Sequence, residues 1–354
     1  MDNINNIYYF DSPVIDFLAS MFRITNNKRM LKNGDIYFED YKFDDELLKL
    51  IEQCDKAINN EMRKKLNLFF NWETYFGMCL VPYVVENDIQ FVEDFISNIR
   101  NINDKELLSL FLGTGYTLEK EGDISIDDII NDERKSIEFI NKNIQIPTEF
   151  KWDLLQFFIN PRKMKNDLIY LFEEFYKIYK NIESFVIDKV EYYKNTLIKN
   201  LHKYGDEYAS IITNTSISKL YEKEKVVFAV SYFYEYACLD AYQNKIHTYM
   251  IGYKYPEAYV EKKHSILSGV DMFKALGDET RLNIIRLLSK KKWYGKELAK
   301  ELKLSNSTIS HHLSLLMLNK IITSDRVDNR TYYTLNEVEF KKHVINAVDN
   351  IIGR

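Results

Sequence analysis

Three short amphipathic segments and a β-prone pair, all within residues 278–335, constrain this chain more than any other feature. In the first segment, apolar residues recur at three- and four-residue spacing up to Leu288, which predicts a helix with one wide buried stripe. A shorter helix follows, with Leu298 and Leu302 on its buried side. The turn at 303–306 then leads into a third helix. This order predicts a helix-turn-helix.

The third helix, expected over 306–319, has an outer side that is polar and almost uncharged. Its members are Asn306, Ser307, Thr308, Ser310, His311, His312 and Ser314. A helix that only faces water normally carries Glu and Lys, as the preceding helix does. Short donors and acceptors near a helix start suit close approach to phosphates and base edges, and Ser305 can cap this helix. We therefore predict a recognition helix for double-stranded DNA.

Two β-prone runs, 321–324 and 331–335, flank the turn formers at 327–330 and predict a β-hairpin. Arginines on such a hairpin can reach phosphates or the minor groove beside a recognition helix. The contacts predicted for this wing (321–335) and for the turn before the third helix are Lys303, Arg326, Arg330 and Tyr332. With the hairpin added, the segment is expected to be a winged helix-turn-helix.

The stretch from Phe273 to Leu335 resembles the DNA-binding domain of the ArsR-type bacterial transcription regulators. The resemblance rests on KALGDETRLNIIRLL, on KELAKELKLSNSTISHHLSLL and on the wing that ends in tyrosines. It implies a dimeric repressor whose recognition helix enters the major groove.

Many members of that family sense metals through cysteines at the start of the second helix of the motif. The matching positions here are Tyr294 and Lys296, so a thiolate site is not expected. Other members use His and carboxylates on the final helix, where this chain has His343 and Asp349 without the paired spacing. We expect neither a metal site nor a cofactor.

The last helix, within 338–353, has an apolar stripe made of Phe340, Val344, Ile345, Val348, Ile351 and Ile352. This stripe and the first helix, around Val270 and Phe273, are expected to form a homodimer interface. A dimer places two recognition helices about 34 Å apart and reads an inverted repeat. The alternative is that the stripe packs against the N-terminal domain.

Charge is distributed unevenly along the chain, whose formal net charge is −5. Residues 267–354 contain 15 Lys and Arg against 10 Asp and Glu, a net charge of +5, and the remainder has a net charge of −10. The basic excess lies where the DNA-reading motif lies. The start lacks the basic and apolar regions of a signal peptide, and no apolar stretch is long enough to span a bilayer. Three scattered cysteines fit a reducing compartment, so a cytoplasmic location is expected.

Residues 1–260 are expected to form a large helical domain with a small β element, ahead of the winged helix-turn-helix domain at 261–354. The predicted fold class is therefore mainly α. Helices are predicted at 43–58, 161–180 and 182–201, and β-like runs, a small hairpin or sheet edge, at 225–230 and 246–251. NPRKMKNDLIYLFEEFYKIYK and VVFAV…YMIGYKYPEAY carry a looser resemblance to a subgroup of the same regulators with a long, largely uncharacterised helical domain.

The N-terminal domain contains no Gly-rich phosphate loop and no HExxH, CxxC or GxSxG motif, so an enzyme is not expected. Tyr232, Tyr234 and Tyr236 lie in a tyrosine-rich stretch, and aromatic rings of this kind are expected to fill a helical core and a domain interface. The sharper hypothesis is that these three tyrosines line a pocket for an apolar or planar effector. Two further hypotheses are that the domain is a protein-interaction platform, or an enzyme without a recognisable motif fused to a DNA-binding module.

Overall fold

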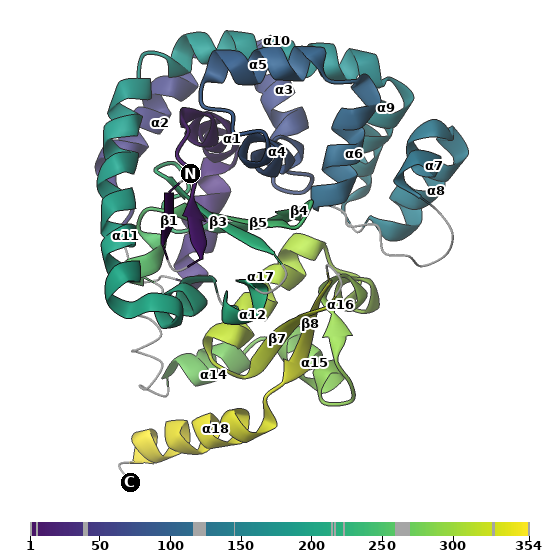
Figure 1. Ribbon diagram of the computed structural model, residues 1–354. Helices are drawn as coiled ribbons and strands as arrows, with labels where there is room; N and C mark the ends of the chain where they lie inside the picture. Colours follow the sequence, from purple (N-terminus) through teal and green to yellow (C-terminus); the bar gives the residue numbers. More distant parts are fainter. Residues whose placement is uncertain are drawn as a thin grey trace. The chain divides into compact units, whose positions relative to one another are not determined.

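The structure, a computed structural model, describes residues 2–4, 6–37, 42–115, 125–144, 146–213, 215, 217–221, 224–258, 270–327 and 330–352 (Figure 1). The chain divides into two compact units. Unit 1 comprises Met1–Ile144, Thr148–Ala209 and Ser216–Pro256; unit 2 comprises Glu257–Arg354 with the short segments Gln145–Pro147 and Ser210–Thr215. The predicted fold class, mainly α with a C-terminal winged helix-turn-helix, is confirmed. No helix among the described residues is long and apolar enough to cross a membrane.

Helices make up most of unit 1, and the three that the sequence predicted are α2, α10 and α11. The helix α11 is longer than expected, because it continues past Gly205, where φ is 58° and the helix is kinked. The helices of the unit are α1 (Pro13–Tyr37), α2 (Asp45–Ala57), α3 (Asn60–Phe69), η1 (Phe76–Leu80), α4 (Val81–Glu86), α5 (Val92–Asn101), α6 (Asp104–Gly115), α7 (Ile126–Asn131), α8 (Glu133–Asn143), α9 (Thr148–Ile159), α10 (Pro161–Tyr179), α11 (Glu183–Thr213) and α12 (Ile217–Tyr221).

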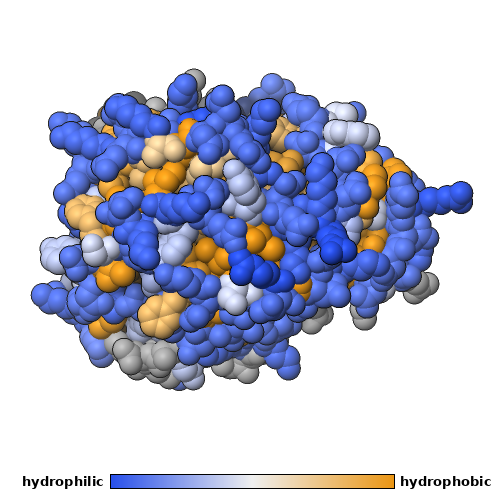
Figure 2. All heavy atoms as spheres, turned by 90° about the horizontal axis from the view of Figure 1, so that it is seen from above, coloured by the Kyte–Doolittle hydropathy of each residue, from blue (hydrophilic) through white to orange (hydrophobic). Residues whose placement is uncertain are grey.

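Aromatic side chains fill the core of this helical unit. Phe17 of α1 packs against four rings of α10, with ring centroids 5.8 Å from Phe172, 5.8 Å from Phe175, 6.0 Å from Tyr176 and 5.4 Å from Tyr179. Burying each such ring stabilises the fold by about 1.5–3 kcal/mol. Seen from the side of α5 and α10, the surface is mostly hydrophilic, and its apolar side chains are exposed in small separate groups (Figure 2). Much of the aromatic excess of the sequence therefore serves packing.

A five-stranded mixed sheet completes unit 1, with helices α1 and α4 against it (Figure 1). Its strands, in the order β1-β2-β3-β5-β4, are β1 (Asp2–Ile4), β2 (Ile7–Tyr9), β3 (Lys225–Ser231), β5 (Ile246–Gly252) and β4 (Cys238–Gln243). The two predicted runs are β3 and β5, but they pair in parallel and so do not form the predicted hairpin with each other. The sheet is wider than the predicted hairpin, because β2 joins β3 in parallel and β4 joins β5 through a turn at Asn244 and Lys245.

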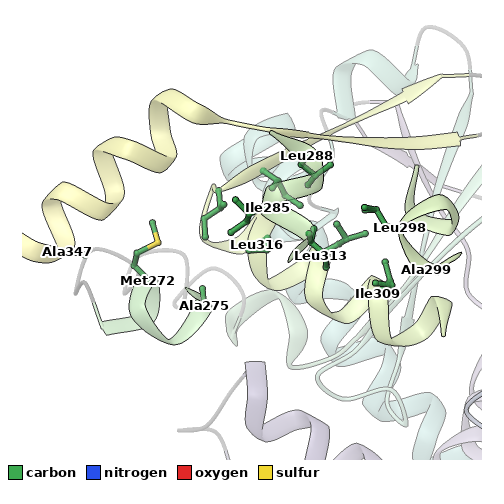
Figure 3. Close-up of a cluster of buried hydrophobic side chains, with 13 residues drawn as sticks. Met272, Ala275, Ile285, Leu288, Leu298, Ala299, Ile309, Leu313, Leu316 and Ala347 are labelled. Atoms are coloured by element: carbon green, nitrogen blue, oxygen red, sulfur yellow. The ribbon is translucent and has the colours of Figure 1, made fainter. Parts of the chain in front are cut away.

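Unit 2 contains the elements of a winged helix-turn-helix around one apolar core (Figure 3). They are α14 (Val270–Leu276), α15 (Glu279–Leu288), β6 (Trp293–Tyr294), α16 (Gly295–Leu302), α17 (Asn306–Leu318), β7 (Ile322–Val327), β8 (Arg330–Leu335) and α18 (Glu337–Ile352). Met272 of α14, Ile285 of α15, Leu298 of α16, Leu313 of α17 and Ala347 of α18 are all buried in this core. The strands form an antiparallel sheet in the order β6-β8-β7.

Candidate nucleic-acid interface

The start of α17 is fixed by the turn that precedes it. Lys303 ends α16 with φ 56° in the left-handed region, and the backbone N–H of Leu304 returns to the carbonyl of Ala299 at 2.9 Å. Ser305 is then the N-cap of α17, and its Oγ accepts a hydrogen bond from the backbone N–H of Thr308 at 3.1 Å. The predicted cap is therefore present, and it leaves the first turn of α17 pointing out of the motif.

The two sides of α17 differ sharply in chemistry. Ile309 and Leu313 are each 1% exposed and enter the core, whereas Ser310 on the other side is exposed. The hydroxyls of Ser307 and Thr308 each lie 2.8 Å from the Oγ of Ser305, which holds them at the start of the helix. The side chain of Ser314 donates to the carbonyl of Ser310 at 2.9 Å, so its hydroxyl is partly used within the helix.

Asn306 is the first residue of α17. Its amide nitrogen and amide oxygen are both buried, and neither has a hydrogen-bond partner among the described residues. An asparagine amide can pair with the edge of adenine, which for Asn306 requires the side chain to turn outward.

The two histidines of α17 point in different directions, as neighbouring helical residues do. His312 is 9% exposed, and its Nδ1 lies 3.6 Å from Oδ1 of Asp278, the N-cap of α15. His311 is half-buried, with its ring centroid 5.7 Å from that of His312. Of the two, His312 is thus placed against α15.

Both imidazoles are held in the neutral form near pH 7. Burial lowers the pKa of His311 to about 4, with further lowering from His312 and Arg281 and an opposing effect of Asp278. Burial also lowers the pKa of His312, while Asp278 raises it and Arg281 lowers it. These rings can therefore donate and accept hydrogen bonds, but they do not supply positive charge for phosphates.

Asp278 and Arg281 join three helices of the motif. Oδ1 of Asp278 accepts from the backbone N–H of Arg281 at 2.9 Å, which caps α15. The guanidinium of Arg281 donates to the carbonyl of Ala275 at 2.6 Å and to that of Lys274 at 2.9 Å, so it caps the end of α14. The sequence predicted the cap at Asp278 but not the contacts of Arg281 with the end of α14. The only signal in the sequence for those contacts was an arginine inside the first turn of an amphipathic helix.

The wing is the hairpin β7–β8, in which Val327 pairs with Arg330. Nη1 of Arg330 lies 3.4 Å from the hydroxyl of Tyr332, whose ring centroid is 6.1 Å from that of Tyr294 on β6. Arg326 pairs with Thr331 in the backbone ladder, and its side chain lies outside the described residues. Arg330 and Tyr332 are thus brought together at one end of the wing.

The three tyrosines predicted for an effector pocket follow β3 but pack against different neighbours. Tyr232 is fully buried, with its ring centroid 4.9 Å from that of Tyr253 and 6.0 Å from that of Phe185. The ring of Tyr234 packs against Phe22 of α1 at 5.8 Å. Tyr236 packs against Phe43 at 5.6 Å, and its hydroxyl donates to the carbonyl of Lys42 at 2.9 Å. The effector pocket stays a prediction.

The positions compared with metal-sensing regulators carry other chemistry here. The backbone N–H of Tyr294 donates to Glu297 at 3.1 Å and so helps to begin α16. Nε2 of His343 lies 3.3 Å from the carboxylate of Glu339 on the same helix. Among the described residues, no group of three or more His, Cys, Asp or Glu is arranged to hold a metal ion. The absence of a metal sensor stays a prediction.

Comparison with known proteins matches residues 278–322 to the family described as "Bacterial regulatory protein, arsR family". The chain is similar to the "Transcriptional repressor SdpR" of Bacillus subtilis, with 31% identity over 86 residues, which is 23% of this chain and 96% of that protein. It is also 32% identical over 80 residues to the "Arsenical resistance operon repressor" of Staphylococcus xylosus, covering 23% of this chain and 76% of that repressor. A third similar protein is the "Transcriptional repressor SmtB homolog" of Synechocystis, with 32% identity over 76 residues, 22% of this chain and 54% of that protein.

Proposed function

Because the chain belongs, through its C-terminal unit, to the ArsR family of bacterial regulatory proteins, we propose that it represses transcription by binding a specific DNA sequence. The family match supports DNA-binding transcription regulation. The observation that supports recognition of a specific sequence is the outer side of α17, where Ser307, Ser310 and Ser314 are uncharged donors and acceptors that are not buried. Such groups discriminate bases in the major groove, whereas charges alone bind every sequence equally.

The proposed contacts divide into two classes. Asn306, Ser307, Ser310 and His311 read base edges, because they are short or neutral groups on the outer side of the first turns of α17. The phosphate contacts come from the turn, from the first turn of α17 and from the wing: Lys303, Thr308, Arg326, Arg330 and Tyr332. Ser305, His312 and Ser314 complete the proposed interface by capping and positioning the helix.

A homodimer is the second part of the proposal. It is supported by the apolar side chains of α18, some of which pack in the core of unit 2 while others are exposed. Ala347 is buried in the core, and Phe340 and Val344 pack against that core. Ile345 is 58% exposed and Ile352 is 54% exposed. Exposed apolar side chains in a row favour a second copy of the chain as their cover, since large apolar surfaces are costly in water.

An effector that acts through unit 1 is the third part. The hydroxyl of Tyr232 is buried and has no hydrogen-bond partner among the described residues. An unsatisfied buried hydroxyl costs about 1–3 kcal/mol, which a polar atom of a bound molecule can offset. Mass spectrometry of the purified protein after denaturation tests this part: we expect a small molecule to be released, and its absence together with no ligand-induced shift in Tm contradicts it.

DNA binding itself is tested by fluorescence anisotropy with the DNA upstream of the protein's own gene and with random duplex of the same length. We expect the upstream DNA to bind at least about 10³-fold more tightly, the lower range for specific recognition. Equal affinity for both duplexes would show that α17 does not read sequence.

A further inference from the structure

Three consecutive lysines, Lys290, Lys291 and Lys292, lie between α15 and β6 and are all exposed. None of them forms an ion pair with a carboxylate of the described residues. Two lysines of α18 do have such partners: Lys341 lies 3.5 Å from Glu337, and Lys342 lies 3.8 Å from Glu339. The three lysines therefore concentrate positive charge that no described carboxylate of unit 2 neutralises through an ion pair.

Two of these ammonium groups form cation–π contacts with aromatic rings. Nζ of Lys291 lies 4.3 Å from the ring centroid of Trp293, and that ring is itself anchored because its Nε1 donates to the carbonyl of Leu287 at 3.0 Å. Nζ of Lys292 lies 5.2 Å from the ring centroid of Tyr332 on β8. A ring face attracts the cation but accepts none of its three N–H donors in a conventional hydrogen bond, so the donors stay available while the side chain is already ordered.

One of these two lysines, Lys292, contacts the wing directly. Lys292 lies over the ring of Tyr332, and the hydroxyl of the same tyrosine is 3.4 Å from Nη1 of Arg330. The strand β6 pairs with β8 at Trp293 and Tyr294 and is an edge strand of the three-stranded sheet, so Lys292, directly before β6, lies at that edge. The cationic side chains thus extend from Lys291 and Lys292, before β6, to Arg330 at the start of β8.

We propose that Lys290, Lys291 and Lys292 form a second phosphate-binding strip, which takes the DNA backbone beyond the base pairs that α17 reads. The inference rests on the proposed DNA-binding function and deepens it. Duplex DNA fits the strip because its phosphates recur at a regular spacing, so neighbouring lysines can engage neighbouring phosphates. Ordered lysines beside a wing arginine extend the footprint without adding sequence preference.

The strip has a measurable signature in the salt dependence of binding. Each phosphate that a protein neutralises contributes about 0.9 to the slope of log K against log salt concentration. Lys291→Gln with Lys292→Gln is expected to lower that slope by about 1–2. It is expected to weaken binding to upstream and random duplexes by the same factor, so that the ratio of the two affinities is unchanged.

The full-length protein is the material for the test, with anisotropy measured between 50 and 200 mM salt. Lys341→Gln with Lys342→Gln is the matched control, because it removes the same charge from α18, and its slope is expected to equal that of the wild type. Lys291→Arg with Lys292→Arg is expected to keep the wild-type slope, which separates lost charge from lost folding. If the wild type binds DNA and the glutamine variant keeps the full slope, the strip is refuted. If the wild type binds neither duplex, the proposed function fails as well.

Discussion

At the scale of single residues, the division between base readers and phosphate binders follows from charge. His311 is neutral at pH 7 because its pKa is lowered to about 4, whereas Arg330 keeps its charge. A neutral imidazole distinguishes bases through its donor and acceptor, while a guanidinium attracts every phosphate alike.

Substituting these two residues separates the two roles. Arg330→Ala is expected to weaken binding to upstream and random DNA equally and to lower the salt slope by about 1. His311→Ala is expected to leave the slope unchanged and to cost about 1–3 kcal/mol only on the upstream sequence. Anisotropy titrations of both variants on both duplexes check this, and identical behaviour of the two variants would contradict the division.

Asp16 in unit 1 is a second residue whose ionisation has a consequence that can be measured. Its Oδ1 accepts from Oγ of Ser231 at 2.7 Å and from the backbone N–H of Phe233 at 3.0 Å, but full burial raises its pKa to about 7. From about pH 4 to 7 the native state therefore binds more protons at this site than the unfolded state does. The contribution of Asp16 to the free energy of unfolding falls as pH rises through that window.

Asp16→Asn is expected to remove this fall, because the amide does not titrate. Urea denaturation at pH 5, 6 and 7.5 gives the difference between wild type and variant, which should shift in favour of the variant as pH rises. A difference that stays constant with pH would show that the carboxyl of Asp16 does not titrate in this range.

At the scale of elements, the joint of Asp278 and Arg281 determines how α14, α15 and α17 meet. Asp278→Ala removes the N-cap of α15 and the carboxylate beside His312, and it is expected to lower the free energy of unfolding by about 0.5–2 kcal/mol. Glu279→Ala is the control, since this exposed first-turn residue acts only through the helix dipole, and its loss is expected to be the smaller of the two. Urea denaturation of both variants measures the contrast, and equal losses would argue against the joint.

The elements that sequence reasoning predicted are those whose signal is local. The spacing of apolar residues in α10 and in α15 to α17, and the caps Asp278 and Ser305, are visible within a few residues. The strands β1, β2 and β4 were missed, since β1 and β2 have three residues each and β2 pairs with a strand more than 200 positions away. No spacing rule connects such distant segments.

The same limit applies to side chains. Arg23 and Glu235 form a buried ion pair at 3.3 Å although 212 positions separate them, and nothing in the local pattern of either indicates a partner. Within unit 2, the residues proposed to contact DNA were recognisable because the missing charge on one helix side is itself a local pattern. The cation–π contacts of Lys291 and Lys292 depend on strand pairing, so they could be recognised only in the structure and not in the sequence.

At the scale of the whole molecule, the proposed reading of an inverted repeat requires two copies of the chain. Ile345→Asp with Val348→Asp places two charges on the exposed side of α18, where these residues are 58% and 41% exposed, and is expected to shift the protein to monomers at micromolar concentration. Ile187→Asp, at a 45% exposed position of α11, is the control and should leave the mass unchanged. Analytical ultracentrifugation distinguishes these outcomes, and a wild type that is already monomeric would remove the dimer from the account.

We propose that the uncharged side of α17 reads bases in the major groove of a specific operator. Hydroxyl-radical footprinting of the full-length protein on the DNA upstream of its own gene tests this proposal. We expect two protected half-sites in inverted orientation, about 10 base pairs apart from centre to centre, and we expect Ser307→Ala with Ser310→Ala to abolish them at concentrations where wild type protects them. Uniform protection along the duplex, or protection that the double variant retains, would contradict it.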